Sequence, residues 1–274
     1  YIHLLSSTNI GLPTDLWVPA TEDAPGQKSW QTGLGIAHDL NQWSTTLSVE
    51  GYYKESQNII TYCEGASFLM FDDPTGANDI KWEDNITSGI GWSYGVEILA
   101  QRKTGKLSGW IGYTLSWTQM QFDEVNFGNP FYARHDRRHD VSVVGVYELS
   151  EDITLSGSWV YGTGNAVTLP LGSFYAYEHY PSDIEYYYGI WPNQYSEYSE
   201  RNGFRMAPYH RLDFGVQFHK HHGSYDTTLE LSIYNVYNRK NPFFYFIDYD
   251  YRYDEHTSEA VSYTHLTLPT KRIV

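Results

Sequence analysis

The chain of 274 residues is long enough for one large β domain or two smaller ones, and its formal net charge of −15 argues against nucleic acid as a partner, because phosphates would be repelled. Aromatic residues make up 17% of the chain, which favours pleated sheets and membrane interfaces. The chain has a single cysteine, Cys63, which excludes an internal disulfide and a zinc site built from cysteines. It contains no run of about 18 apolar residues, so no transmembrane helix is predicted.

Apolar and polar residues alternate with a period of two along the chain, which predicts β-strands with two different faces. In chain order, the clearest segments are TTLSVEGYY (45–53), GIGWSYGVEIL (89–99), LSGWIGYTLSWT (107–118), ITLSGSWVY (153–161), HRLDFGVQFHK (210–220) and TLELSIY (228–234). Helical periodicity is not sustained over comparable lengths. We therefore expect an all-β fold with antiparallel hairpins over 30–54, 88–119, 134–162 and 208–238 in one curved sheet.

The connections between these strands alternate in length. Those after about residues 37, 102, 149 and 220 are short, whereas those over 7–29, 55–87, 120–133, 163–207 and 239–259 are long. Short periplasmic turns and long extracellular loops are typical of outer-membrane barrels, so the pattern predicts about ten transmembrane strands. A soluble β-sandwich is the alternative, but it gives no reason for the long loops to gather at one end.

A barrel places one face of each strand against lipid and the other toward the lumen. The residues predicted to face lipid include Leu115, Trp117, Trp159 and Phe214, with Trp117 and Tyr113 toward the outer end, where amphipathic rings favour the headgroup layer. The polar residues predicted to face the lumen are Glu50, Glu97, Asp140, Arg211, Asp213 and Glu230. We interpret the acidic ones as part of a hydrated wall, since nothing in their spacing makes two of them converge as catalytic carboxylates.

Two clusters rich in histidine invite a sharper interpretation. RHDRRHD (134–140) is interpreted as an ion-paired ladder, with Arg134, Asp136, Arg138 and Asp140 on the lumen side by strand parity. HKHHG (219–223) has the density of a metal-binding tract but lies at a predicted periplasmic turn, so no metal site is predicted. No catalytic residues and no cofactor are predicted either.

The long connection 163–207 is the most distinctive candidate for ligand binding. Its candidate ligand-binding rings are Tyr186, Tyr187, Tyr188, Trp191, Tyr195 and Tyr198, and several carboxylates lie beside them. Aromatic faces beside a few carboxylates suit sugars, peptides, or a cationic or metal-chelate ligand. The alternative is that these rings only pack on one another as a lid.

Six blocks of the sequence resemble the C-terminal barrel of TonB-dependent outer-membrane receptors of the type abundant in Bacteroidota. In the family's order they are YIHLLSSTNIGLPTDLWVPA (1–20), 91–118, 134–150, WVYGTGNAVTLPL (159–171), YHRLDFGVQF (209–218) and YNVYNRKNPFF (234–244). The resemblance covers about residues 1–260. It implies a 22-stranded barrel plugged by an N-terminal domain, of which this chain holds roughly the last ten strands.

The resemblance also implies a function. We expect a receptor in the outer membrane of a Gram-negative bacterium that contacts lipid and takes up a scarce small or oligomeric ligand. Energy would come from the TonB complex through an N-terminal part that lies outside this sequence. A passive porin-like channel or an outer-membrane hydrolase barrel is the alternative. Residues 261–274 depart from the family pattern, and we interpret them as an aberrant tail in place of the last strand, read from sequencing adapter.

Overall fold

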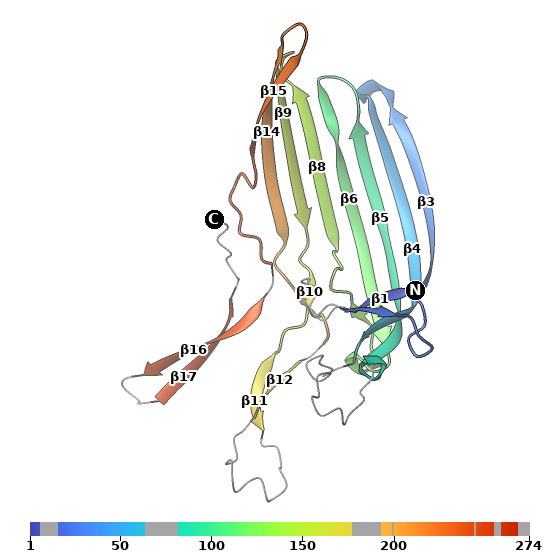
Figure 1. Cartoon of the computed structure of the whole chain (residues 1–274), viewed down its shortest axis with the longest axis vertical. Helices are drawn as coiled ribbons and strands as arrows, with labels where there is room; N and C mark the ends of the chain where they lie inside the picture. Colours follow the sequence, from blue (N-terminus) through green and yellow to red (C-terminus); the bar gives the residue numbers. More distant parts are fainter. Residues whose placement is uncertain are drawn as a thin grey trace, which may run out of the picture.

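The computed structural model describes residues 1–5, 16–63, 82–176, 193–198, 200–243, 245–254 and 259–267. One antiparallel sheet dominates this part of the chain (Figure 1). Its long strands, in spatial order, are β15 (Asp226–Ile233), β14 (Tyr209–His221), β9 (Ile153–Gly162), β8 (His139–Glu148), β6 (Leu107–Phe122), β5 (Ile86–Arg102), β4 (Thr45–Tyr62) and β3 (Lys28–Leu40). The short strand β7 (Phe131–Tyr132) also pairs with β6. The all-β prediction is confirmed, as are the four predicted hairpins.

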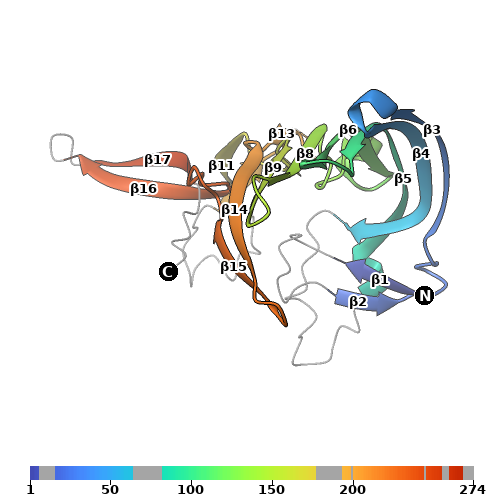
Figure 2. The same ribbon diagram turned by 90° about the horizontal axis from the view of Figure 1, so that it is seen from above.

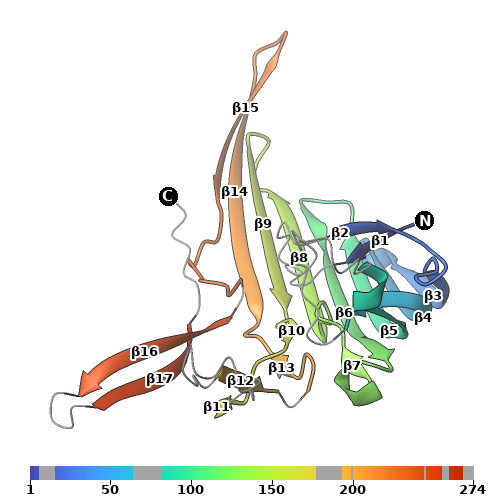
Figure 3. The same cartoon turned by 60° about the horizontal axis from the view of Figure 1, so that its bottom comes forward.

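Smaller antiparallel pairs lie outside the main sheet. They are β1 (Ile2–Leu5) with β2 (Leu16–Pro19), β10 (Ala166–Val167) with β13 (Phe204–Arg205), β11 (Gly172–Ala176) with β12 (Asn193–Glu197), and β16 (Phe246–Asp254) with β17 (Glu259–Thr267). Figure 3 shows that β16 and β17 extend away from the sheet. The main sheet therefore contains eight long strands rather than about ten, because the segments expected as first and last strands pair locally instead. Residues 261–267 of the predicted tail belong to β17, and 268–274 lie outside the described residues.

The predicted alternation of short and long connections is also confirmed. The short turns at 41–44, 103–106, 149–152 and 222–225 lie at one end of the sheet, and the long connections leave from the other (Figure 1). Gly105 and Gly223 adopt φ values of 92° and 80° in two of these turns, a region that costs glycine little. The first turn contains the 3-10 helix η1 (Asn41–Trp43), while η3 (Trp82–Asn85) and η4 (Asn126–Gly128) lie at the long-loop end.

Strand register places most apolar residues on one face of the sheet and most charged residues on the other. One row of directly opposed residues runs Leu34, Gly51, Val96, Leu115, and the next row runs Gly35, Glu50, Glu97, Thr114, Asp140. We call the surface that carries the first row the apolar face and the opposite surface the polar face. Because side chains alternate along a strand, one consistent register keeps the two sets apart across every strand.

The sheet is curved, as Figure 2 shows, and the space around its glycines differs between the two faces. A Cβ atom added at Gly95 on the polar face would lie 2.6 Å from the Leu115 carbonyl oxygen and 3.0 Å from the Ser116 Cβ. On the apolar face, a Cβ atom at Gly145 would meet nothing within 4 Å. Side chains on the inner side of a bent sheet have less room, and this crowding agrees with a concave polar face. Gly109 on the apolar face is the exception, since its φ is 145° and an added Cβ atom would lie 2.1 Å from the Val144 carbonyl oxygen.

A small hydrophobic core covers part of the polar face near the long-loop end of the sheet. It consists of Ile59, Phe122, Val125 and Phe131, with the rings of Phe122 and Phe131 stacked at 6.0 Å. A β-bulge at Asn58, which has a φ of 56°, shifts the register so that Ile59 points to the polar face. Part of the long connection 123–138 thereby packs over the inner wall. No helix in the described ranges is long and apolar enough to cross a membrane.

Candidate functional site

A belt of aromatic pairs crosses the apolar face from β3 to β14. The ring pairs, with centroid distances, are Trp30–Tyr53 at 5.3 Å, Tyr94–Trp117 at 5.3 Å, Tyr113–His139 at 6.1 Å, Trp159–Tyr161 at 6.1 Å and His210–Tyr237 at 5.4 Å. Two of the pairs also join their polar ends, since the hydroxyls of Tyr113 and Tyr237 lie 2.9 Å and 2.7 Å from histidine Nδ1 atoms. Rings with an apolar body and a polar tip favour the boundary between hydrocarbon and water.

Between this belt and the short turns, the apolar face carries exposed aliphatic and aromatic side chains. Leu34, Ile111 and Leu231 are 84%, 53% and 60% exposed, and Phe214 is 41% exposed. The four residues predicted to face lipid, Leu115, Trp117, Trp159 and Phe214, all lie on this face by register. A contiguous exposed apolar surface that spans a whole sheet marks an interaction site.

The polar face presents the predicted acidic residues in two groups. Glu50 and Glu97 stand directly opposite each other on β4 and β5, and Asp140 follows in the same row across Thr114. Like charges in opposed positions repel, so this row requires hydration or a cationic partner. Farther toward the short turns, Gln217 donates to Glu230 at 3.1 Å.

Arg211 and Asp213 form the centre of a hydrogen-bonded network on β14. Their side chains make an ion pair at 2.9 Å, and the Arg211 guanidinium also lies 4.2 Å from the centroid of the Tyr234 ring. The Asp213 carboxylate accepts from the backbone N–H of Asn235 at 2.9 Å. The charges of Arg211 and Asp213 therefore neutralise each other within the sheet. The Arg211 guanidinium is held in one orientation beside the ring and hydroxyl of Tyr234.

The side chain of Asn241 forms the hydrogen bonds to the backbone of His210 in β14 that a neighbouring strand would otherwise form. Its oxygen accepts from the His210 N–H at 3.1 Å, and its Nδ2 donates to the His210 carbonyl at 3.0 Å. Arg239 binds the same segment by donating to the Pro208 carbonyl at 3.0 Å. The segment after β15 is thus attached to the loop end of β14 through these side chains and through a bond from the Val236 N–H to the Leu212 carbonyl at 2.7 Å, beyond the end of the β15 ladder at Ile233.

Asp136 anchors the long connection 163–207 to the wall. Its side chain is completely buried and accepts from the backbone N–H of Thr118 at 2.6 Å. Its carboxylate also pairs with Arg138 at 3.4 Å and with Arg205, which donates a second bond to the Asp136 carbonyl at 2.6 Å. A buried carboxylate held by two guanidinium groups is a strongly coupled unit.

The prediction that Arg134 to Arg138 follow the parity of β8 is wrong, because β8 begins only at His139. Arg138 instead stacks on the ring of Trp117 at 4.4 Å and lies 5.2 Å from the centroid of Tyr132, so it joins the aromatic belt. The expected ion pairing itself is observed, with Asp136 as described and with Arg137 and Asp140 at 3.5 Å. Burial lowers the pKa of Arg134 from its usual value.

Most of the predicted ligand-binding rings lie outside the described residues, namely Tyr186, Tyr187, Tyr188 and Trp191. The other two are placed at the long-loop end of the molecule. Tyr195 is opposite Phe174 in the β11–β12 ladder, and Tyr198 is 54% exposed just beyond it (Figure 3). The long connection is thus partly a paired extension of the wall, built from β10 with β13 and from β11 with β12.

Two further polar contacts involve Cys63 and His221. The Cys63 thiol donates to Glu124 at 3.4 Å, and burial together with this carboxylate raises the pKa of Cys63. Across the turn 222–225, His221 at the end of β14 pairs with Asp226 at the start of β15. Among the residues that the structure places, no group of three or more histidine, cysteine or acidic side chains could hold a metal ion.

Sequence reasoning missed Arg205 and the stacking role of Arg138. Arg205 is 69 positions from its partner Asp136, and no spacing rule connects them. The position of Arg138 beside Trp117 could have indicated its stacking role if the register of the hairpin were known. That register depends on where β8 begins.

No protein-family model and no curated protein matches the sequence. Among solved structures, the chain is similar to the ferripyoverdine receptor of the outer membrane of Pseudomonas aeruginosa bound to ferripyoverdine, with a TM-score of 0.44 and 10% sequence identity. The similarity covers 78% of this chain and 24% of the receptor, so the chain spans about a quarter of that protein's length.

Proposed function

We propose that this chain forms part of the wall of an outer-membrane β-barrel. The observation that carries the proposal is the division of one curved sheet into an inner polar face and an outer apolar face crossed by an aromatic belt. Short turns at one end and long connections at the other agree with it. The long strands contain 8 to 18 residues, and about 9–11 suffice to cross a bilayer at a tilt.

The open edges of the sheet support a larger barrel. In the described part of the chain, no strand pairs with the outer edge of β3 or of β15. Lipid cannot satisfy unpaired backbone groups, which cost several kcal/mol each, so a membrane-embedded sheet must close. Strands outside this sequence would complete the wall, as in the 22-stranded plugged class that the sequence resembles.

The function we propose is uptake of a scarce ligand by a TonB-coupled receptor. The long connection 163–207, with Tyr195 and Tyr198 and the neighbouring Tyr186 to Trp191, would bind the ligand at the outer surface. The polar face, including Glu50, Glu97 and the Arg211–Asp213 pair, would line the lumen beside the plug. The wall would supply no covalent chemistry, and the TonB complex would act on the N-terminal part.

Conductance distinguishes this function from a passive channel. The full-length protein that contains this sequence should show no steady ohmic conductance in a planar bilayer, because a plug fills the lumen. Removal of the upstream plug should open a large, stable pore. A full-length protein that conducts steadily would instead support the porin-like alternative and contradict the proposal.

A further inference from the structure

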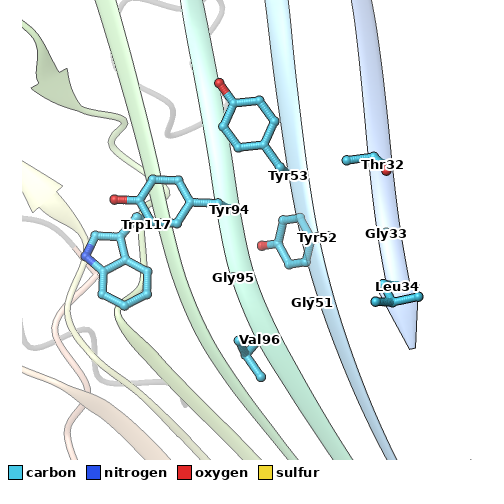
Figure 4. Close-up of a pocket in the computed structure, with 10 residues that line it drawn as sticks. All are labelled: Thr32, Gly33, Leu34, Gly51, Tyr52, Tyr53, Tyr94, Gly95, Val96 and Trp117. Carbon is cyan, nitrogen blue, oxygen red and sulfur yellow. The ribbon is translucent and has the colours of Figure 1, made fainter. Parts of the chain in front are cut away.

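A shallow groove of about 370 Å³ crosses the apolar face between β3 and β6 (Figure 4). Its floor is Gly51, which lies between Leu34 and Val96 in one row of the sheet. Because Gly51 has no side chain, the surface is one side chain lower there than at its neighbours. The groove volume is within the range of small-molecule sites.

The walls of the groove join the aromatic belt to the aliphatic part of the apolar face. Tyr53, Tyr94 and Trp117 form the side nearer the long loops, and Leu34 and Val96 form the side nearer the short turns (Figure 4). The rings of Tyr94 and Trp117 are stacked with an angle of 13° between their planes. The groove thus begins at the level of the belt and leads toward the aliphatic side chains of Leu34 and Val96.

A positive charge lies at the belt end of the groove. The Arg138 guanidinium lies over the Trp117 ring, 4.4 Å from its centroid, and it donates to the Ser116 carbonyl at 3.0 Å. Arg138 and Arg205 share the single carboxylate of Asp136, so this group carries a net positive charge in a chain that is strongly acidic overall. An anion at this end would meet unbalanced positive charge.

We propose that the groove binds one acyl chain of an anionic phospholipid, with the lipid phosphate beside Arg138 and the chain over Gly51. This inference rests on the proposed membrane location of the apolar face. It adds one specific lipid site to a face whose other residues would contact lipid without specificity. The order of the parts, cation, rings and aliphatic hollow, matches the order of phosphate, interface and chain in a lipid.

Two glycine substitutions provide a matched test. Gly51→Leu fills the groove, and a Cβ atom at Gly51 has only the Gly95 carbonyl oxygen at 3.9 Å, so the sheet accommodates it. Gly145→Leu adds the same side chain to the same face outside the groove, where a Cβ atom meets nothing within 4 Å. Arg138→Gln removes the charge, and Arg138→Lys retains it.

The measurement is native mass spectrometry of the full-length protein from nanodiscs that contain either phosphatidylglycerol or phosphatidylcholine. The wild type and Gly145→Leu should retain one phosphatidylglycerol through delipidation, and Gly51→Leu should lose it. Arg138→Gln should lose the preference for phosphatidylglycerol over phosphatidylcholine, and Arg138→Lys should recover part of it. Equal retention by Gly51→Leu and the wild type would overturn the inference. If a spin label at Ile98 still reports lipid in that case, the proposed function stands without the lipid site.

Discussion

Asp136 and Arg205 are 69 positions apart in the sequence, yet their ion pair is one of the points at which the connection 163–207 is attached to the wall. Arg205 donates to both the carboxylate and the backbone carbonyl of Asp136, and the ring of Tyr132 covers its guanidinium at 4.8 Å. The pair therefore helps to fix where the connection 163–207 leaves the sheet, together with the bonds from the Ala166 N–H to the Arg134 carbonyl and from Asn202 Nδ2 to the Tyr132 carbonyl.

The first prediction follows from this pair. Asp136→Asn leaves two guanidinium groups without their shared carboxylate and should lower the free energy of unfolding by roughly 3 kcal/mol. This value is at the low end of the range for buried ion pairs, because both arginine side chains keep some contact with water. Asp140→Asn should cost less than about 1 kcal/mol, since its pair with Arg137 is half exposed. Urea unfolding of the full-length protein in lipid vesicles measures both, and similar losses would show that Asp136 is not an anchor.

The second prediction concerns the two faces. Arginine at Leu115 or Phe214 should cost roughly 2–4 kcal/mol near mid-membrane, whereas arginine at Thr114 or Gln217 should cost far less, because those positions face the polar interior. Folding into lipid vesicles followed by denaturant titration measures the difference. Equal costs on the two faces would refute the assignment of the apolar face to lipid.

The third prediction tests the attachment of the segment after β15. Asn241→Leu removes both side-chain bonds to the His210 backbone and should cost about 1–3 kcal/mol, because the His210 N–H and carbonyl lose their partner. Asn241→Asp keeps the acceptor for the N–H and should lose less. A stability of Asn241→Leu equal to that of the wild type would mean that the contact contributes nothing.

The fourth prediction is a pH dependence of Cys63. Because its pKa is raised, first by burial and then by Glu124, less thiolate is present at pH 8 than for a free cysteine. Alkylation by iodoacetamide should therefore be slow at pH 8 and accelerate only at higher pH. Glu124→Gln should shift the profile of rate against pH partway toward that of a free thiol. An unshifted profile in this variant would show that the carboxylate has no influence.

The alternation of apolar and polar residues predicted the strands, the four hairpins and the two faces, because a period of two has one physical meaning in a sheet. Turn positions followed from segments such as KTGK around Gly105. The same reasoning failed where the ladder ends. It extended the parity of β8 back to Arg134, and it could not foresee that the bulge at Asn58 moves Ile59 to the inner face.

The candidate site was less predictable than the fold. By register, Trp117 and Trp159 lie on the apolar face, and Arg211 and Asp213 lie on the polar face. Their partners were not predicted, since contacts such as Arg138 on Trp117 depend on the register between strands and on irregular segments. The hollow at Gly51 likewise exists only because Leu34 and Val96 flank it on neighbouring strands.

Spin labels placed one at a time along β5 from Tyr94 to Leu99, in the full-length protein with Cys63→Ser in a bilayer, test the central claim most directly. The measurement is the collision rate of each label with oxygen, which concentrates in lipid, and with a water-soluble nickel chelate. Labels at Tyr94, Val96 and Ile98 should collide mainly with oxygen, and labels at Gly95, Glu97 and Leu99 should not, giving a period of two. Water accessibility at Val96 and Ile98 equal to that at Glu97 would contradict a lipid-facing apolar surface and with it the outer-membrane barrel.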